Sequence, residues 1–104
     1  MTYGIITTIT GDSSMYDKLH GELLQRTGGQ IAGLLLHIGK TTEQGFQVIE
    51  IWESKDQFDR CNRDIIWPLA SQVLTNDAAA APVATEEFEP RGLVIPATGR
   101  TLAE

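Results

Sequence analysis

The chain is 104 residues long and 41% hydrophobic, which fits one domain (1–104) with one modest core. Its net charge of −6, without any basic run, argues against nucleic acid and against anionic membrane surfaces as partners. A single cysteine cannot form an intrachain disulfide, no apolar run is long enough to span a membrane, and the N-terminus lacks a signal-peptide pattern, so we expect a cytoplasmic protein.

The first part of the chain predicts a strand followed by a helix. Residues Tyr3–Ile9 are rich in β-branched side chains, which favour a strand. Apolar residues then recur at three- and four-residue spacing from Met15 to Leu24, which predicts an amphipathic helix. Gly28 follows four residues after Leu24 and is a suitable residue to end that helix, because glycine tolerates a left-handed cap.

Two further strands are predicted over Ile31–Lys40 and Phe46–Glu53, joined by a short turn at Thr41–Gly45. Both runs carry apolar residues at odd and at even positions, which is typical of strands covered on both faces. A short connection of this kind predicts an antiparallel hairpin.

A second helix is predicted after the hairpin, with Ser54 as its N-cap and Gln57 completing a capping box. Pro68 falls inside the helical pattern, so we expect a kink or interruption near Asp64–Trp67. The apolar face of this helix would be made by residues at helical spacing, namely Phe58, Cys61, Ile65, Leu69 and Val73.

The end of the chain predicts a loose loop over residues 76–82, then a last strand within Glu87–Pro96, most securely Gly92–Ile95. We expect residues 97–104 to form a flexible tail or to be borrowed by a partner subunit. The order is therefore βαββαβ, an α+β fold with a four-stranded antiparallel sheet and both helices on one face. Because the middle strands are apolar on both parities, a second copy of the sheet is expected to cover the other face, giving a homodimer.

The segment from Trp52 to Leu69 resembles the strand-to-helix junction of the dimeric α/β-barrel superfamily, which includes the antibiotic biosynthesis monooxygenase-like proteins. The matching pattern is W-x-S-x-x-x-F, here Trp52, Ser54 and Phe58. The element order extends the resemblance over Thr2–Pro96. It implies a ferredoxin-like fold and the dimeric α/β barrel, in a superfamily of cofactor-free monooxygenases, haem-degrading enzymes, polyketide cyclases and members without known activity.

The haem-degrading branch uses a tryptophan and a histidine on the second helix. Alignment on the W-x-S junction places Cys61 and Ser71 at those positions, and places Thr7 near an expected asparagine. Because the axial ligand is missing, we do not expect haem, and the sequence implies no other cofactor. Two histidines on different elements do not make a recognisable metal site either, and no glycine-rich phosphate loop is present.

His37 and Glu50 are the candidate catalytic residues. If the hairpin turns near Thr42 and Glu43, His37 lies across from Val48–Glu50, and one face can hold an imidazole beside a carboxylate. Such a pair can act as a general base with an orienting partner. The alternative is a structural polar pair, which buried polar groups form in any case.

Candidate substrate-binding residues lie on the second helix. Trp67 next to Pro68 predicts either the lip of an apolar pocket, with Phe58 as a wall, or a kink that only fits the curvature of the barrel. Asn62 and Arg63 lie one turn earlier, and Arg63 either anchors an anionic oxygen or pairs with a helix neighbour such as Asp59. Four other residues have mainly structural interpretations: His20 at a helix edge, Cys61 as a small hydrophobe, and Tyr3 and Tyr16 as pocket or core residues.

These features predict a small homodimeric enzyme that acts on an apolar or aromatic small molecule without a bound cofactor. The reaction would be an oxygenation, a cyclisation or a proton transfer. One alternative is a non-catalytic small-molecule-binding or accessory dimer on the same scaffold. Another is a purely structural dimer with a filled interior, which predicts that no cavity exists between the helices and the sheet.

Overall fold

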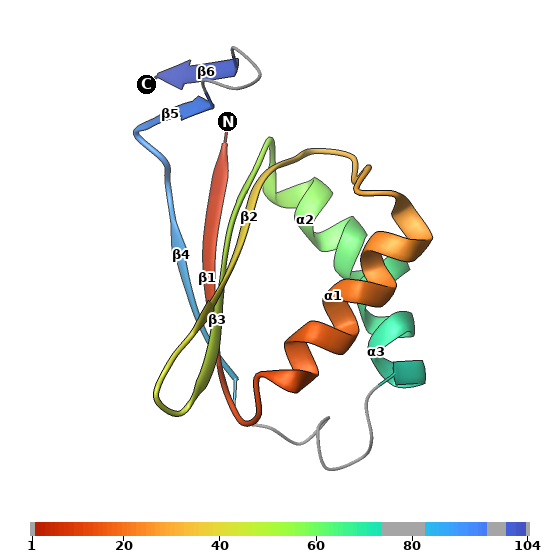
Figure 1. Cartoon of the computed structure of the whole chain (residues 1–104). Coiled ribbons are helices and arrows are strands. Elements are labelled where there is room, and N and C mark those ends of the chain that lie inside the picture. The colour runs from red at the N-terminus through yellow and green to blue at the C-terminus, as the bar shows by residue number, and fades with distance from the viewer. Residues whose placement is uncertain (1, 74–82, 96–99, 104) are drawn as a thin grey trace.

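The computed structural model describes residues 2–73, 83–95 and 100–103. A four-stranded sheet lies against helices that cover one of its faces (Figure 1). The strand order is β2-β3-β1-β4 and every neighbouring pair is antiparallel, which confirms the predicted ferredoxin-like α+β arrangement. The strands are β1 (Tyr3–Thr10), β2 (Leu34–Thr41), β3 (Gly45–Trp52) and β4 (Val83–Phe88).

Helix α1 (Ser14–Thr27) forms where the apolar spacing predicted it. The Ser14 backbone N–H donates to Asp12 Oδ1 at 3.0 Å, which satisfies one of the unpaired N–H groups at the helix start. Gly28 ends the helix in the left-handed conformation, with φ of 63°, and its N–H donates to the Leu24 carbonyl. Leu23 is buried and anchors the apolar face of the helix.

The hairpin of β2 and β3 forms as predicted, but β2 begins at Leu34 rather than at Ile31. Gly33 lies in a turn with φ of 86°, a conformation that ends strand geometry and favours glycine. Within the hairpin, His37 lies directly opposite Glu50. The local turn therefore shortens the strand without disturbing the register that the site depends on.

The second helical region is interrupted, as Pro68 predicted. It consists of α2 (Lys55–Cys61), a π-helical segment (Asn62–Ile66) and α3 (Trp67–Val73). Ser54 caps α2, since its Oγ accepts from the Gln57 N–H at 3.2 Å. At the π-helical turn the Trp67 N–H bonds to the carbonyl of Asn62, five residues back. Pro68 has no N–H to continue the regular helical bonding, and the widened turn precedes it directly.

The end of the chain differs from the prediction. The strand that pairs with β1 is Val83–Phe88, and not Gly92–Ile95. Gly92–Ile95 is strand β5, which pairs with β6 (Arg100–Ala103) in a separate two-stranded sheet. The side chains of β4 are mostly exposed and two are glutamates, so the pattern of apolar residues indicates a strand only weakly there. The backbone pairing with β1 stabilises this segment as a strand. The predicted loop at 76–82 lies outside the described residues.

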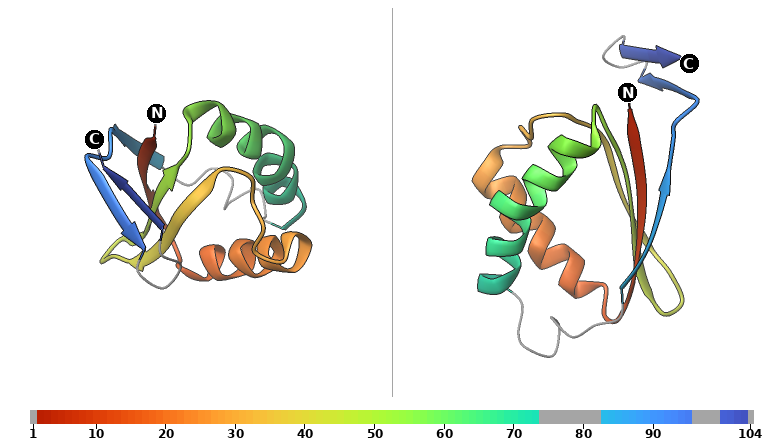
Figure 2. Two further views of the ribbon diagram at one scale, coloured as in Figure 1. Left: turned by 90° about the horizontal axis from the view of Figure 1, so that it is seen from above. Right: turned by 180° about the vertical axis from the view of Figure 1, so that it is seen from behind.

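The two faces of the sheet have different surroundings. Figure 2 shows α1 and α2–α3 together on one side of the sheet and no helix on the opposite side, toward which β5 and β6 lie in the left view. Ile6, Ile49 and Ile38 lie side by side across β1, β3 and β2, on the face away from the helices. Ile38 is 45% exposed. The apolar residues at odd and even positions therefore correspond to one face that the helices cover and one face, with Ile38 exposed, that no described helix covers.

Candidate functional site

A cavity of about 810 Å³ lies between the helices and the sheet. Its size excludes the interpretation in which side chains fill this space. Most of its wall is apolar, with β1 and β3 contributing one side and the helices the other. The apolar lining residues are Ile5, Ile9, Phe46, Val48 and Val83 from the sheet, and Met15, Leu19, Leu23, Phe58, Ile66, Trp67 and Ala70 from the helices.

His37 and Glu50 meet in the wall of this cavity, on neighbouring strands. His37 Nδ1 lies 2.6 Å from Glu50 Oε2, so the predicted contact is confirmed. The two side chains are only 18% and 16% exposed. Trp52, two residues along β3 on the same face, donates its indole N–H to Glu50 Oε1 at 3.2 Å. Both carboxylate oxygens of Glu50 are therefore engaged by ring N–H groups.

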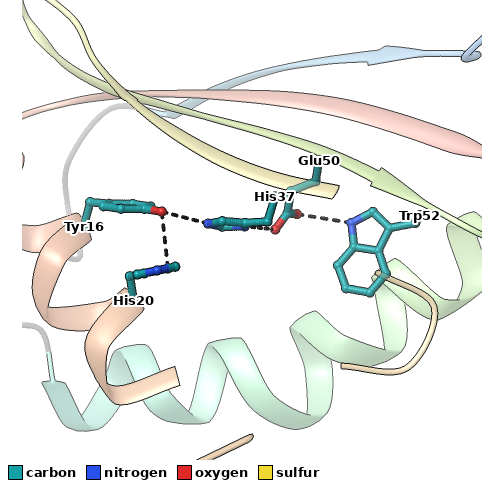
Figure 3. A network of polar contacts seen from close by, with 5 residues as sticks. All are labelled: Tyr16, His20, His37, Glu50 and Trp52. Atoms are coloured by element: carbon teal, nitrogen blue, oxygen red, sulfur yellow. Dashed lines mark hydrogen bonds and ion pairs between the residues drawn. The ribbon is translucent and has the colours of Figure 1, made fainter. Parts of the chain in front are cut away.

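Helix α1 adds two residues to this pair (Figure 3). The Tyr16 hydroxyl lies 2.8 Å from His37 Nε2 and 3.2 Å from His20 Nδ1. We call these five residues (His20, Tyr16, His37, Glu50 and Trp52) the polar network. All of them except Trp52 line the cavity, and they are the most concentrated polar part of its wall.

The three rings at the α1 end of the polar network lie nearly parallel. The rings of Tyr16, His20 and His37 have interplanar angles of 15° and centroids 5.0–5.9 Å apart. Gly39 makes room for this arrangement, because a Cβ at that position would lie 2.5 Å from Tyr16 Oη. Burial, followed by the negative charges of Glu50 and Asp17, raises the pKa of Tyr16 above its ordinary value. Tyr16 is therefore held as a neutral phenol at physiological pH.

The predicted substrate-binding residues divide into two groups. Phe58, Asn62 and Trp67 line the cavity, and Trp67 is 64% exposed, which places it at the rim. Arg63 does not line the cavity. It is exposed and donates to both carboxylate oxygens of Asp64, at 2.9 and 3.2 Å, so the structure places it outside the cavity that the other predicted residues line. The pairing with a helix neighbour, which was the other expectation, is present, and the partner is Asp64 and not Asp59.

Sequence reasoning missed the importance of Tyr16 and His20. The usable signal was their spacing, because residues at i and i+4 on a helix lie on the same face. That face also carries Leu19 and Leu23, so both polar rings had to point toward the sheet. What the sequence lacked was the position of His37 relative to α1.

Two further findings for the described residues concern metal binding and membrane-spanning helices. Within residues 2–73, 83–95 and 100–103, no group of three or more His, Cys, Asp or Glu side chains is arranged to hold a metal ion. None of the helices in the described part of the chain is long and apolar enough to cross a membrane.

No family model and no curated protein matches the chain. Solved structures do match it. An assigned antibiotic biosynthesis monooxygenase from Caulobacter crescentus is 14% identical over 86% of this chain and 89% of its own, with a TM-score of 0.64. A mutant of SnoaB, a cofactor-independent oxygenase from Streptomyces nogalater, is 15% identical over 91% and 97%, also with a TM-score of 0.64.

The haem-degrading protein MhuD from Mycobacterium tuberculosis, solved with two haems bound, is also similar. It is 17% identical over 85% of this chain and 94% of its own, with a TM-score of 0.56. The aligned second-helix residues do not fit haem ligation here. Cys61 lines a separate small hollow and burial raises the pKa of its thiol to about 11, while Ser71 donates its hydroxyl to the Trp67 carbonyl.

The identities are all low, so the likeness concerns the fold. It covers most of both chains in each case, and it agrees with the antiparallel β2-β3-β1-β4 sheet and its one-sided helices. The chain therefore has the ferredoxin-like fold of the antibiotic biosynthesis monooxygenase-like proteins, as the junction at Trp52, Ser54 and Phe58 implied.

Proposed function

We propose that this protein is a small homodimeric enzyme of the antibiotic biosynthesis monooxygenase-like type, which oxygenates a hydroxylated aromatic molecule without a bound cofactor. One observation carries the proposal: a hydrogen-bonded polar network, with the His37–Glu50 pair at its centre, lies in the wall of a mostly apolar cavity. An apolar pocket with a few convergent polar groups is the usual form of a small-molecule site.

The chemistry that this arrangement supports is removal of a proton. A carboxylate behind an imidazole fixes its orientation and stabilises the imidazolium that forms, as in other general-base pairs. Deprotonation of an electron-rich phenol or enol gives an anion that O2 can oxidise directly. For an anthrone, the CH2 group and O2 give the quinone carbonyl and one molecule of water, so the atoms balance without a further reductant.

The other lining residues fit an aromatic substrate. Phe58 and Trp67 offer flat apolar surfaces, and the Asn62 amide can donate to or accept from a substrate oxygen. A cofactor-independent oxygenase, SnoaB, is among the proteins that share the fold, which supports the same class of reaction. His37 is the proposed proton acceptor, and Glu50 is its orienting partner.

The test is incubation of the protein with a hydroxylated anthrone and isotopically labelled O2, followed by mass spectrometry. We expect a quinone that carries one labelled oxygen, formed faster than in buffer. His37→Ala should lower the rate by about 100-fold or more, as for loss of a general base. Binding of the anthrone, seen as thermal stabilisation, without any product would instead support a non-catalytic small-molecule-binding protein.

We further propose that the open sheet face forms the dimer interface. The row of Ile6, Ile49 and Ile38 leaves apolar surface exposed that a second sheet would cover. Ile38→Lys should convert the dimer to a monomer in sedimentation equilibrium. Leu24→Lys is the matched control, since Leu24 on α1 is 46% exposed against 45% for Ile38. A monomeric unaltered protein, or dissociation by both variants alike, would contradict this interface.

A further inference from the structure

The donors and acceptors of the polar network fix the direction in which its protons point. The indole N–H of Trp52 can only donate, so Glu50 Oε1 accepts. Glu50 Oε2, as a carboxylate oxygen, accepts from His37, so the proton of the neutral imidazole is on Nδ1. His37 Nε2 is then an acceptor, and the Tyr16 hydroxyl donates to it at 2.8 Å. Tyr16 Oη in turn accepts from His20 Nδ1–H at 3.2 Å.

This arrangement leaves His37 without an open ring nitrogen. Nδ1 is bonded to Glu50, and Nε2 is bonded to Tyr16. A ligand in the cavity cannot give a proton to His37 unless it displaces the Tyr16 hydroxyl. Tyr16 Oη has two lone pairs, of which His20 uses one, so the other can accept a hydrogen bond from a ligand. Tyr16 and His37 both line the cavity, and the Tyr16 hydroxyl occupies the one His37 ring nitrogen that Glu50 does not.

We propose that Tyr16 is the catalytic residue that takes the proton from a phenolic or enolic O–H of the ligand, and that His37 acts through it. The ligand O–H bond breaks and an O–H bond forms on Tyr16, while the original Tyr16 proton moves to His37 Nε2. The ligand keeps the electron pair as a phenolate, and His37 becomes an imidazolium beside Glu50. Nothing is oxidised or reduced in this step, which rests on the proposed function and precedes its reaction with O2.

The surroundings of Tyr16 suit this role. Its own helix contributes His20 and Asp17, β2 contributes His37 and β3 contributes Glu50. The cavity-lining residues described on α2, the π-helical segment and α3 bring no titratable group, only apolar side chains, an amide and a hydroxyl. His20 is a positioning residue, because its N–H holds the phenol oxygen and can stabilise the partial negative charge during the transfer.

The experiment uses 4-nitrophenol, whose phenolate absorbs visible light and whose neutral form does not. On binding to the unaltered protein, we expect the phenol–phenolate midpoint of the probe to fall by roughly one pH unit, about tenfold in the ionisation equilibrium. Tyr16→Phe should remove that shift while the probe still binds. His20→Asn should retain most of it, since the amide can replace the Nδ1–H donor, and His20→Ala should reduce it.

Tyr3→Phe is the matched control for Tyr16→Phe. Tyr3 Oη donates to Glu87 Oε2 at 2.7 Å, and Tyr3 is not among the residues that line the cavity, so its removal should leave the shift unchanged. Equal ionisation of the bound probe by Tyr16→Phe and the unaltered protein would overturn the proposal in favour of direct transfer to His37. Absence of probe binding, or binding without a shift, in the unaltered protein would overturn it too.

The same experiment separates this inference from the proposed function. A Tyr16-dependent shift of the probe, together with the absence of labelled quinone from the anthrone, supports the proton transfer and overturns the oxygenation. Labelled quinone formed at an unchanged rate by Tyr16→Phe supports the oxygenation and overturns the role of Tyr16.

Discussion

Replacement of Glu50 by glutamine is the most informative single change, because it preserves shape and removes only the charge and one acceptor. Both Glu50 oxygens accept in the unaltered protein, from His37 at 2.6 Å and from Trp52 at 3.2 Å. A glutamine has one oxygen and one NH2 group, so it can accept from only one of the two rings. The other ring N–H would face a donor, or His37 would move its proton to Nε2 and reverse the direction of its bond to Tyr16.

The expected cost follows from these contacts. A hydrogen bond to a charged group contributes about 1.5–3 kcal/mol, and the pair is mostly buried, so little of that is lost to solvent screening. We expect Glu50→Gln to lower the free energy of unfolding by about 1.5–3 kcal/mol. With an unfolding entropy of about 0.22 kcal/mol/K for a chain of this length, the unfolding midpoint should fall by about 7–14 °C.

Calorimetry of Glu50→Gln beside Glu43→Gln measures this effect, since Glu43 makes the same change on the exposed hairpin loop. Glu43→Gln should shift the midpoint by no more than about 2 °C, as expected for a surface substitution. The 15N shifts of the His37 ring should also report Nδ1–H in the unaltered protein and a changed tautomer in Glu50→Gln. An unchanged unfolding midpoint, or an Nε2–H tautomer in the unaltered protein, would refute the assignment of His37 Nδ1–H as the donor to Glu50 and of the Tyr16 hydroxyl as the donor to His37 Nε2.

Three further predictions test the site and the core. Gly39→Ala should displace the Tyr16 ring and break its hydrogen bond to His37. The shift in the phenol–phenolate midpoint of 4-nitrophenol should then be lost while the far-UV circular dichroism is retained, and retention of the shift would contradict the close packing of Gly39 against Tyr16. Leu69→Ala should cost about 2–5 kcal/mol in urea unfolding, because Leu69 is 1% exposed, whereas the exposed Leu24→Ala should cost about 0.5 kcal/mol or less. Burial raises the pKa of Cys61 from 9.0 to about 11, so its thiolate fraction near neutral pH falls about 100-fold, and native protein should react with a thiol reagent at least that much more slowly than unfolded protein; equal rates would exclude a buried thiol.

The features that the sequence predicted correctly depend on residues close together along the chain. The cap at Ser54 and the interruption before Pro68 are decided within one or two helical turns. The contact of His37 with Glu50 follows from a single short turn, because the turn sets the register of the whole hairpin.

The errors occurred where local pattern and tertiary pairing disagree. The strand at Val83–Phe88 has exposed side chains, and its backbone pairing with β1 decides its conformation. The more apolar Gly92–Ile95 pairs elsewhere, with β6. Arg63 was expected near the cavity because it lies one helical turn before Trp67. It is instead exposed on the π-helical segment, where it donates to Asp64.

The sequence by itself determined the element order as far as the second helical region, and the imidazole–carboxylate pair, since apolar spacing, caps and a short turn are local properties of the chain. Only the tertiary structure decided what that pair can do. Helix α1 returns across the sheet and brings Tyr16 to His37, 21 residues away, and the bare backbone of Gly39 lets the phenol ring approach. The packing of α1 against the sheet therefore gives the paired histidine a second partner, a tyrosine hydroxyl that occupies its remaining ring nitrogen in the wall of the cavity.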